Sequence, residues 1–289
     1  MDIKVVGVVG SGIMGSGIAQ TFALAKLDVV LLDISQEMLQ KALKVVRTSV
    51  QSMVKRGKLK EEELEAALRR ITTTVSYADL ARADVIIEVV SENLEIKKKV
   101  FNAIDEVAGP NCIISSNTSS ISITKLASMI PRRSAKFVGL HFFNPVPAMK
   151  LVEVIRGLQT GDDAFNAMMQ LAERAGKVPV SCTDSPGFVC NRILIPMINE
   201  AAFAVFEGVA TPKDVDQVMK LGANHKMGPL ALADLIGMDT VLSVMQVLHR
   251  DFGDPKYRPC PLFNKMVDAG HLGRKSGKGF FEYKPTAKM

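Results

Sequence analysis

The sequence has no tryptophan, three tyrosines, four histidines and four cysteines among its 289 residues. So few aromatic side chains leave few platforms on which the bases of single-stranded nucleic acid stack. The cysteines show neither Cys-x-x-Cys spacing nor clustering; they are Cys112, Cys182, Cys190 and Cys260. We therefore expect no disulfide framework and no metal site, and reduced thiols favour a cytoplasmic protein.

Long apolar runs are also missing from the sequence. No uninterrupted apolar stretch approaches the roughly 18 residues that a membrane span needs. The apolar N-terminus is broken by glycines and then by Lys26 and Asp28, and strand-like sequence begins as early as Ile3. Neither a signal peptide nor an Arg/Ser-rich transit peptide is expected. We predict a soluble chain with no membrane partner.

Charge is in excess but unevenly distributed. The net charge of +6 predicts an anionic partner, and charge alone would also suit nucleic acid. Residues 41–70 hold nine Lys/Arg against four Glu, and residues 271–289 hold five against one, so the rest of the chain is net negative. A charge run of this kind is usually a solvated helix pair. The alternative is a site for a polyanionic ligand near the predicted cofactor domain. We expect no nucleic-acid partner.

The first half of the chain alternates β-branched runs with helical patterns, including helix-like residues 14–26 and 36–54. Its apolar runs show little alternation with polar residues, which is typical of strands buried on both faces. This pattern predicts an α/β fold with a doubly wound parallel sheet of the Rossmann type. The expected strands are residues 3–9, 28–33, 71–74, 85–89, 112–115, 136–141, 150–155 and 177–181.

The pattern changes after Ser185. Apolar residues then follow i, i+3, i+4 spacing to the mid-270s, with helix punctuation such as Thr211-Pro212 and Gly228-Pro229. We place a domain boundary there. Residues 1–185 are expected to form a Rossmann-like domain with an inserted helical hairpin at about 41–70, and residues 186–289 an all-helical domain. Its broad apolar helix faces favour a homodimer formed through this second domain.

A G-x-G-x-x-G motif follows the first apolar run and opens a helix. Its residues are Gly10, Ser11, Gly12, Ile13, Met14 and Gly15. Gly10 permits a tight turn, Gly12 lets the backbone approach a pyrophosphate, and Gly15 permits close helix–strand packing. The amides of the helix N-terminus then face the phosphates. We therefore expect residues 1–185 to bind a dinucleotide.

Asp33 ends the second predicted strand, 18 residues after Gly15. A carboxylate at this position accepts hydrogen bonds from the adenosine ribose hydroxyls and repels a 2′-phosphate. Neither Ile34 nor Ser35 supplies the arginine expected of an NADP site. The cofactor predicted is NAD rather than NADP. The alternative is that Asp33 is only a surface residue of a turn.

His141 is the one histidine at the end of an apolar strand, just before Pro145 and Pro147. Strand ends line the ligand crevice of a doubly wound sheet, and a neutral imidazole there can accept a hydroxyl proton while hydride leaves the same carbon. Glu153, 12 residues later, lies inside another apolar strand. A buried carboxylate needs a partner, and a histidine N–H is the obvious one. A satisfied core histidine beside an unrelated carboxylate is the alternative.

Several longer motifs carry a family resemblance that spans nearly the whole chain. They are Ser116-Asn117-Thr118-Ser119-Ser120, the HFFNPVPAMKLVEV stretch from His141, Asp184–Arg192, and Gly277-Lys278-Gly279-Phe280-Phe281. This set resembles the short-chain L-3-hydroxyacyl-CoA dehydrogenases, and above all the bacterial 3-hydroxybutyryl-CoA dehydrogenases. The resemblance implies hydride exchange between NAD(H) and (S)-3-hydroxyacyl-CoA or 3-ketoacyl-CoA, and its bacterial members imply the 3-hydroxybutyryl-CoA/acetoacetyl-CoA pair.

The same resemblance implies roles for individual residues. His141 is the general base, Glu153 orients it, Ser120 binds the substrate oxygen at C3, and Asn191 positions the thioester. Further cofactor residues are Glu92, Lys97, Asn117, Ser120, Asn144 and Lys275. Coenzyme A contacts fall at Ser49 and Arg56; lysine is usual in the family at the latter, and Lys55 is adjacent.

Each implied role has a plainer alternative. Ser119 or Ser120 could simply cap a helix beginning near Ile121. At the level of the whole protein, one alternative is another two-domain 3-hydroxyacid dehydrogenase, although such enzymes use a lysine base. Another is a non-catalytic, crystallin-like protein that only binds NAD(H).

Overall fold

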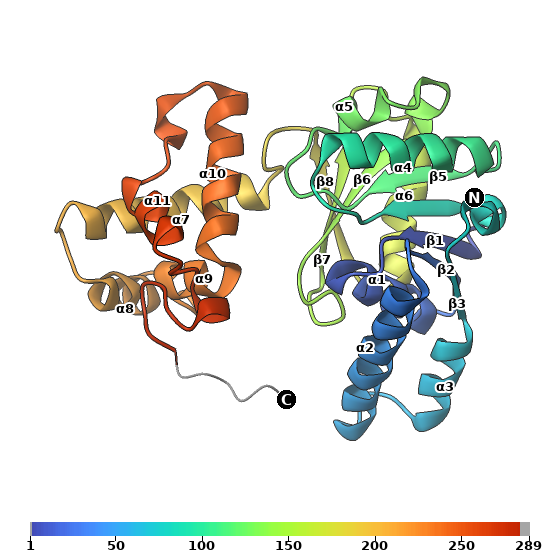
Figure 1. Ribbon diagram of the computed structural model, residues 1–289, viewed down its shortest axis with the longest axis horizontal. Helices are drawn as coiled ribbons and strands as arrows, with labels where there is room; N and C mark the ends of the chain where they lie inside the picture. The colour runs from blue at the N-terminus through green and yellow to red at the C-terminus, as the bar shows by residue number, and fades with distance from the viewer. Residues whose placement is uncertain (1, 284–289) are drawn as a thin grey trace. The chain divides into compact units, whose positions relative to one another are not determined.

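The computed structural model describes residues 2–283. The chain divides into two compact units, Met1–Ser185 and Pro186–Met289. In Figure 1 the first unit carries the blue to yellow-green elements and the second the yellow to red ones. Each unit has a hydrophobic core of its own.

An eight-stranded sheet forms the centre of the first unit, in the order β3-β2-β1-β4-β5-β6-β7-β8. β1 to β6 pair in parallel, which confirms the doubly wound α/β fold. The central strands are buried along their length, as their continuous apolar sequence predicts. The strands are β1 (Val5–Val9), β2 (Asp28–Leu32), β3 (Ile71–Thr74), β4 (Val85–Glu88), β5 (Ile113–Ser116), β6 (Phe137–Phe142), β7 (Leu151–Arg156) and β8 (Val178–Thr183).

The sheet departs from the predicted parallel arrangement at one edge. β7 pairs antiparallel with β6, and β8 then pairs in parallel with β7. Residues 143–150 are all that separate β6 from β7, whereas a parallel return needs a crossover of a dozen or more residues. The predicted parallel arrangement holds from β3 to β6, and the antiparallel pair was not foreseen because apolar periodicity does not encode strand direction.

Helices cover both faces of the sheet (Figure 1). One face shares a core with α1 (Ile13–Leu24), α2 (Gln36–Lys55), α3 (Glu61–Arg69) and α6 (Asp162–Arg174). Elements on the other face are η1 (Tyr77–Arg82), α4 (Leu94–Val107), α5 (Ile123–Ala127) and η2 (Pro131–Lys136). Because both faces are covered, polar functional groups are restricted to the strand ends.

A long helical hairpin, α2 with α3, extends from the sheet between β2 and β3 (Figure 1). α2 buries Leu39, Ala42, Val46 and Val50, a stripe at the spacing of one helix face. α3 begins after the turn at Gly57, whose φ is +68°, and packs on α2. The inner side of the hairpin therefore joins the core, and its outer side stays polar.

The second unit is helical. Its elements are α7 (Cys190–Phe206), α8 (Pro212–Gly222), α9 (Pro229–Ile236), α10 (Met238–Phe252), η3 (Pro255–Tyr257), α11 (Pro261–Asp268) and η4 (Arg274–Ser276). Thr211 caps α8, accepting a hydrogen bond from the Asp214 amide, and Pro212 opens the helix. Gly237, with φ +105°, separates α9 from α10. Helix punctuation read from the sequence thus marks real helix ends.

Asp234 fastens the end of the described chain to the helical core. Its buried carboxylate accepts hydrogen bonds from the Phe280 and Phe281 amides, at 2.9 and 3.0 Å, and from the Tyr283 hydroxyl. Burial raises the pKa of Asp234, against the lowering effect of these donors. A Cβ on Gly279 would lie 1.9 Å from an Asp234 oxygen, so the glycine is required for this close approach.

Within residues 2–283, no helix taken singly combines the length and apolarity of a membrane span. α9 and α10 meet that test only when joined, and they are bent by 99° at their junction.

Candidate active site

The glycine turn is built as its spacing predicts. Gly10 has a φ of +107°, and a Cβ on Gly15 would lie 1.8 Å from the Gly10 carbonyl oxygen, so both positions require glycine. Gly12, the N-cap of α1, has nothing within 4 Å of the position of a Cβ, and no side chain caps the helix. The first amides of α1 are therefore open to an anionic group, which suits a pyrophosphate.

Asp33 is bound to this turn. Its Oδ2 accepts hydrogen bonds from the amide and hydroxyl of Ser11, both at 2.6 Å, and its Oδ1 accepts one from the Ile34 amide at 2.7 Å. The Gly10 amide donates to the carbonyl of Leu32 at 2.8 Å. These bonds fix the turn against the end of β2. A carboxylate has about four acceptor sites, so Asp33 keeps capacity for ribose hydroxyls.

The order of the strands reverses between β1 and β4, because β2 and β3 lie on one side of β1 and β4 to β6 on the other. Dinucleotides bind across such a switch point, with each half over one side of the sheet. Asp33 marks the β2 side. The half of a dinucleotide beyond the pyrophosphate would therefore lie over the carboxyl ends of β4 and β5.

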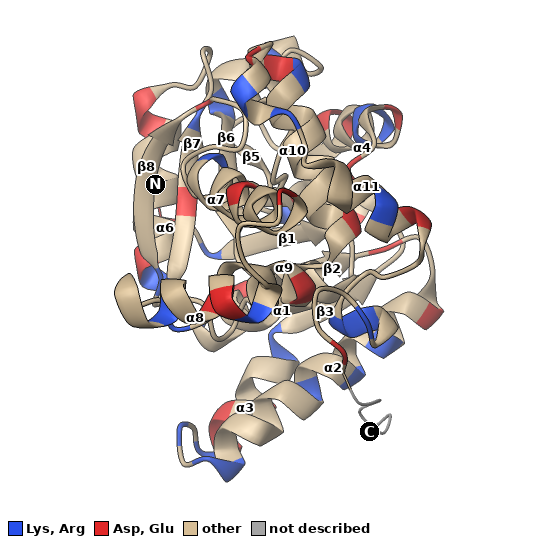
Figure 2. Cartoon of the chain, turned by 90° about the vertical axis from the view of Figure 1, so that its left-hand side faces the viewer, with Lys and Arg blue, Asp and Glu red and all other residues tan. Residues whose placement is uncertain are grey.

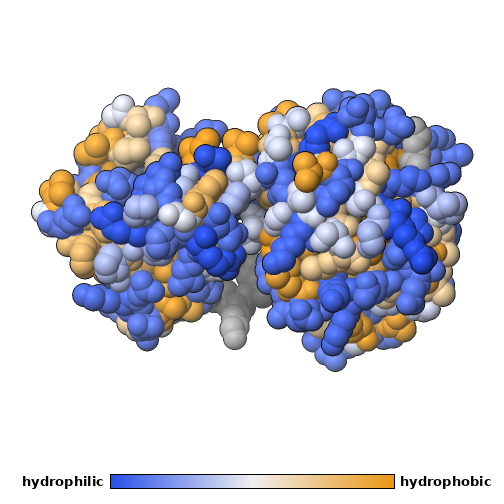
Figure 3. Space-filling view, turned by 90° about the horizontal axis from the view of Figure 1, so that it is seen from above, coloured by the Kyte–Doolittle hydropathy of each residue, from blue (hydrophilic) through white to orange (hydrophobic). Residues whose placement is uncertain are grey.

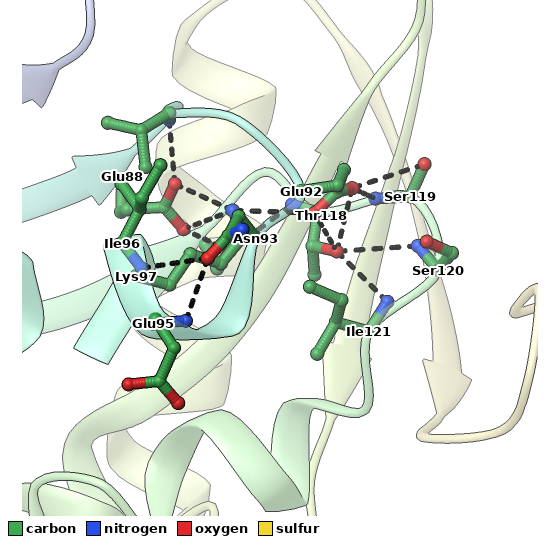
Figure 4. Close-up of polar contacts among 12 residues, drawn as sticks. Glu88, Glu92, Asn93, Glu95, Ile96, Lys97, Thr118, Ser119, Ser120 and Ile121 are labelled. Atoms are coloured by element: carbon green, nitrogen blue, oxygen red, sulfur yellow. Dashed lines mark hydrogen bonds and ion pairs between the residues drawn. The ribbon is translucent and has the colours of Figure 1, made fainter.

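A buried ion pair lies at the end of β4 (Figure 4). The Lys97 ammonium contacts both carboxylate oxygens of Glu88, at 2.7 and 2.8 Å, and each residue is at most 1% exposed. Glu88 also accepts hydrogen bonds from the Ser116 hydroxyl at 2.6 Å and the Val90 amide at 2.7 Å. The carboxylate is fully satisfied, which is the condition under which a buried charge is tolerated.

Glu92 joins the loops that follow β4 and β5 (Figure 4). Its carboxylate accepts hydrogen bonds from the Thr118 hydroxyl at 2.9 Å and from the Ser119 amide at 2.7 Å. The Thr118 hydroxyl in turn accepts from the amides of Ser120 and Ile121, at 3.3 and 3.0 Å. The position of Ser120 is therefore coupled to that of Glu92.

The alternative in which Ser119 or Ser120 caps a helix near Ile121 is wrong. The helix, α5, begins at Ile123, and its cap is Ser122, whose hydroxyl accepts a hydrogen bond from the Lys125 amide at 3.1 Å. Asp184 supplements the cap, because its carboxylate accepts from the Ile123 and Thr124 amides. The loop with Ser120 is thus held by Thr118 and Glu92.

His141 and Glu153 meet across the antiparallel pair β6 and β7. They are opposite each other in the register, and His141 Nδ1 lies 2.8 Å from Glu153 Oε2. Both are buried, and the Phe143 ring lies 4.5 Å from the imidazole, centroid to centroid. The structure brings this predicted pair together, and the strand end places it at the same edge as the glycine turn.

The turn after His141 is fixed from two sides. The Phe142 amide donates to Asn117 Oδ1 at 2.8 Å. The buried ammonium of Lys177 donates to the carbonyls of Val146 and Met149, at 2.5 and 2.9 Å, and burial lowers the pKa of Lys177. Asn144, exposed, lies within this turn. Asn117 thus lines the strand end and also fixes the backbone at Phe142.

The predicted coenzyme A contacts lie away from the sheet. Ser49 is half-buried on α2, whereas Lys55 and Arg56 are exposed where α2 ends. α2 has 20 residues, so its end is about 30 Å from its start beside Asp33. Figure 2 shows basic residues at the tip of this hairpin, which we call the basic tip: Lys55, Arg56, Lys58 and Lys60. Within residues 2–283 none of the four forms an ion pair.

Two predicted residues belong to the second unit. Asn191 is the second residue of α7. Lys275, in η4, contacts both carboxylate oxygens of Asp239 at 2.6 Å, and both side chains are about half exposed. Against the raising effect of burial, the hydrogen bond from Lys275 lowers the pKa of Asp239. The structure therefore gives Lys275 an acidic partner of its own.

Sequence reasoning missed Glu88, Thr118 and Lys177. Glu88 ends an apolar strand, so the argument that singled out Glu153 would have found it. Thr118 lies inside the motif of residues 116–120, but no sequence pattern distinguishes its hydroxyl from those of the neighbouring serines. Lys177 precedes a strand and looks like any solvated lysine; only the fold buries it.

One edge of the Rossmann-type sheet carries both a glycine turn that suits a dinucleotide and a histidine that a carboxylate orients. These features define the class of protein as an NAD-dependent dehydrogenase. In residues 2–283 no group of three or more His, Cys, Asp or Glu is placed to hold a metal ion. Residues 5–185 match the NAD binding domain of 3-hydroxyacyl-CoA dehydrogenase, and residues 187–283 match the C-terminal domain. The chain belongs to the 3-hydroxyacyl-CoA dehydrogenase family.

Its relatives include bacterial and animal proteins. The probable 3-hydroxybutyryl-CoA dehydrogenase of Bacillus subtilis is 49% identical over 98% of both chains. The human mitochondrial hydroxyacyl-coenzyme A dehydrogenase is 39% identical over 98% of this chain and 92% of that one. The crystal structure of (S)-3-hydroxybutyryl-CoA dehydrogenase from Ralstonia eutropha superimposes with a TM-score of 0.96 and 52% identity, covering 98% of this chain and 100% of that chain.

Proposed function

We propose that this chain interconverts (S)-3-hydroxybutyryl-CoA and acetoacetyl-CoA, with NAD(H) as the redox partner. The observation that carries the proposal is the His141–Glu153 pair, at 2.8 Å, on the edge of the sheet that holds the glycine turn. The names of the similar bacterial proteins support the substrate.

His141 has the geometry of a general base. Glu153 is acceptor-only when ionised, so the proton of the His141–Glu153 bond is best placed on Nδ1, which leaves Nε2 to accept the hydroxyl proton at C3. Glu153 then stabilises the imidazolium that forms. In the reverse direction the same nitrogen returns the proton to the C3 oxygen. Ser120 is proposed to bind that oxygen, and Asn191 to position the thioester.

The residues present fit NAD. Bound NAD would supply the hydride acceptor, and its adenosine ribose would meet Asp33 and its pyrophosphate the amides around Gly12. The far half would lie near Glu92 and Asn117, which border the ends of β4 and β5. Lys97 would act through Glu92, because its ammonium is buried against Glu88. Asn144 and Lys275 are proposed to complete the cofactor site.

The basic tip suits the phosphates of coenzyme A. Lys55 and Arg56 put two uncompensated positive charges next to each other, and Ser49 adds a hydroxyl on the same helix. Substrate is thus proposed to bind along α2, with its acyl end directed to His141. A guanidinium at position 56 keeps the charge that the family usually takes from lysine and offers a fork for phosphate oxygens.

We assign NAD binding to residues 1–185, and dimerisation together with a share of substrate binding to residues 186–289. Figure 3 shows hydrophobic residues scattered over a largely hydrophilic face. On α8, Val218 and Leu221 are 66% and 77% exposed and lie three residues apart on one side of the helix. Such side chains support a homodimer interface. Light scattering should then give about 63 kDa, twice the 31.4 kDa of one chain.

A cytoplasmic location is also proposed. Cys112, Cys182 and Cys260 are buried free thiols. Burial raises the pKa of Cys112 and of Cys182 to about 12. Thiols that are not paired in disulfides are typical of a reducing compartment.

The test of the function is NADH oxidation in the presence of acetoacetyl-CoA. Turnover should require the thioester, so free acetoacetate is the matched control, and His141→Ala should abolish it. A folded chain that binds NADH but shows no turnover with acetoacetyl-CoA would contradict the proposal and leave the non-catalytic alternative.

A further inference from the structure

Glu88 is a fully buried carboxylate to which the reaction gives no direct task. We propose that Glu88 is a positioning residue that sets the charge beside the nicotinamide. Because Glu88 and Glu92 share the single cation Lys97, the three residues carry a net charge of −1 with Glu92 at the exposed end, and that charge favours the cationic ring of NAD⁺ over the neutral ring of NADH. This inference rests on the proposed function, because it presumes that the site binds NAD(H).

Distances decide which carboxylate neutralises the ammonium. Lys97 Nζ lies 2.7 and 2.8 Å from the oxygens of Glu88 but 3.4 Å from Glu92 Oε2. Glu88 and Lys97 are buried, whereas the side chain of Glu92 is 40% exposed. The Glu88–Lys97 pair is therefore neutral as a unit, and the exposed end of the network carries one negative charge.

Hydrogen bonds hold the Glu92 carboxylate without cancelling its charge. The Thr118 hydroxyl and the Ser119 amide both donate to it (Figure 4). Within residues 2–283, Lys97 is the one cation in an ion pair with Glu92. The charge is thus fixed in place at the ends of β4 and β5, on the side of the switch point opposite Asp33. A dinucleotide that starts at Asp33 ends with its nicotinamide on that side.

The summed charge of the three residues decides the direction in which the relative affinity for NAD⁺ and NADH changes. Wild-type Glu88, Lys97 and Glu92 total −1, and Glu88→Gln brings the total to 0 while keeping a side chain of the same shape. Lys97 is then free to neutralise Glu92. Affinity for NAD⁺ should fall relative to NADH, because the reduced ring carries no charge. The ratio Kd(NAD⁺)/Kd(NADH) is expected to rise by roughly fivefold.

The double variant Glu88→Gln/Lys97→Met separates charge from structure. It removes both members of the buried pair and returns the total to −1. Removing both charges together leaves no unpaired buried charge, so the protein should fold. Its Kd ratio should return to the wild-type value. If Lys97 itself contacted the cofactor, or if Glu88 only supported the fold, the Kd ratio of the double variant would stay different from the wild-type value.

Calorimetric titration of wild-type and variant proteins with NAD⁺ and with NADH measures the ratio. Asp105→Asn, which breaks the partly buried Asp105–Arg133 pair elsewhere in the same unit, is the control: it should lower Tm and leave the ratio unchanged. If Glu88→Gln does not fold, Glu92→Gln takes its place. It also brings the summed charge of the three residues to 0, so it should raise the ratio Kd(NAD⁺)/Kd(NADH).

An unchanged ratio in every folded variant that totals 0 would overturn the inference while leaving the proposed function intact. Absence of any NAD⁺ or NADH binding by the wild-type chain would instead contradict the proposed function.

Discussion

His141 and Glu153 stand opposite each other in the register of β6 and β7, and their side chains meet at 2.8 Å. Opposed residues of an antiparallel pair have Cβ atoms about 5 Å apart on one face of the sheet. Backbone pairing therefore brings the two side chains together, and neither relies on a flexible loop. The antiparallel turn that departs from the predicted parallel sheet is the feature that makes this contact possible.

Glu153→Gln should lower kcat by about 100-fold with little change in KM for acetoacetyl-CoA. An amide in place of the carboxylate neither fixes the Nδ1–H tautomer nor stabilises the imidazolium. Steady-state kinetics with NADH at 340 nm give both constants. Arg156→Gln, on the same strand but paired with Asp162, is the control and should retain activity. A Glu153→Gln enzyme with unaltered kcat would show that His141 needs no orienting carboxylate.

Asp33→Ser should lower the preference for NAD over NADP by roughly tenfold or more, because a carboxylate repels the 2′-phosphate. The measurement is kcat/KM for NADH and for NADPH. Asp28→Ser is the matched control, because Asp28 begins the strand that Asp33 follows, is exposed and pairs with Arg70. Equal preference in Asp33→Ser and wild-type enzyme would remove Asp33 from the cofactor site.

The inner strands such as β1, β4 and β6 were predictable from sequence because they are short, largely apolar runs that are buried. β3 and β8 are less apolar and more exposed, and there β-branched residues carried the prediction. The glycine turn and Asp33 were predictable because their chemistry fixes both residue type and spacing. His141 and Glu153 were predictable singly, as a histidine and a carboxylate in apolar surroundings. Their contact depends on the direction of β7, which periodicity does not contain.

Networks were harder to predict than single residues. Glu88, Lys97, Glu92 and Thr118 come from two strand ends and one helix, and their contacts depend on the parallel register of β4 and β5. The cap of α5 was misplaced for a related reason: several serines precede the helix, and Asp184, distant in sequence, helps to fix which of them caps it.

Lys55→Glu with Arg56→Glu should raise KM for acetoacetyl-CoA by roughly tenfold and leave KM for NADH unchanged, because two of the four positive charges of the basic tip are reversed. The wild-type KM should itself rise with salt, since exposed charges are screened. Lys44→Glu, three turns earlier on α2 and also exposed, is the control for charge reversal alone. A parallel rise of KM for NADH would contradict the assignment of the tip to coenzyme A.

Lys177→Met should destabilise the protein, and more so at high pH. The variant loses the donors to Val146 and Met149, a loss of roughly 1–3 kcal/mol in the free energy of unfolding. Burial lowers the pKa of Lys177 below its usual 10.5, so between the two values the unfolded chain binds more protons than the folded one. The contribution of Lys177 to stability is then complete above pH 10.5 and declines as pH falls through the folded-state pKa.

Urea unfolding of wild type and variant at pH 8 and pH 10 tests this prediction. The gap between their free energies of unfolding should be larger at pH 10. Lys136→Met, which also removes an ammonium donating to a backbone carbonyl but a more exposed one, is the control for the loss of a donor and should lower the free energy of unfolding by less. A gap for Lys177→Met that shrinks toward pH 10 would contradict the burial of a charged ammonium beneath the turn that follows His141.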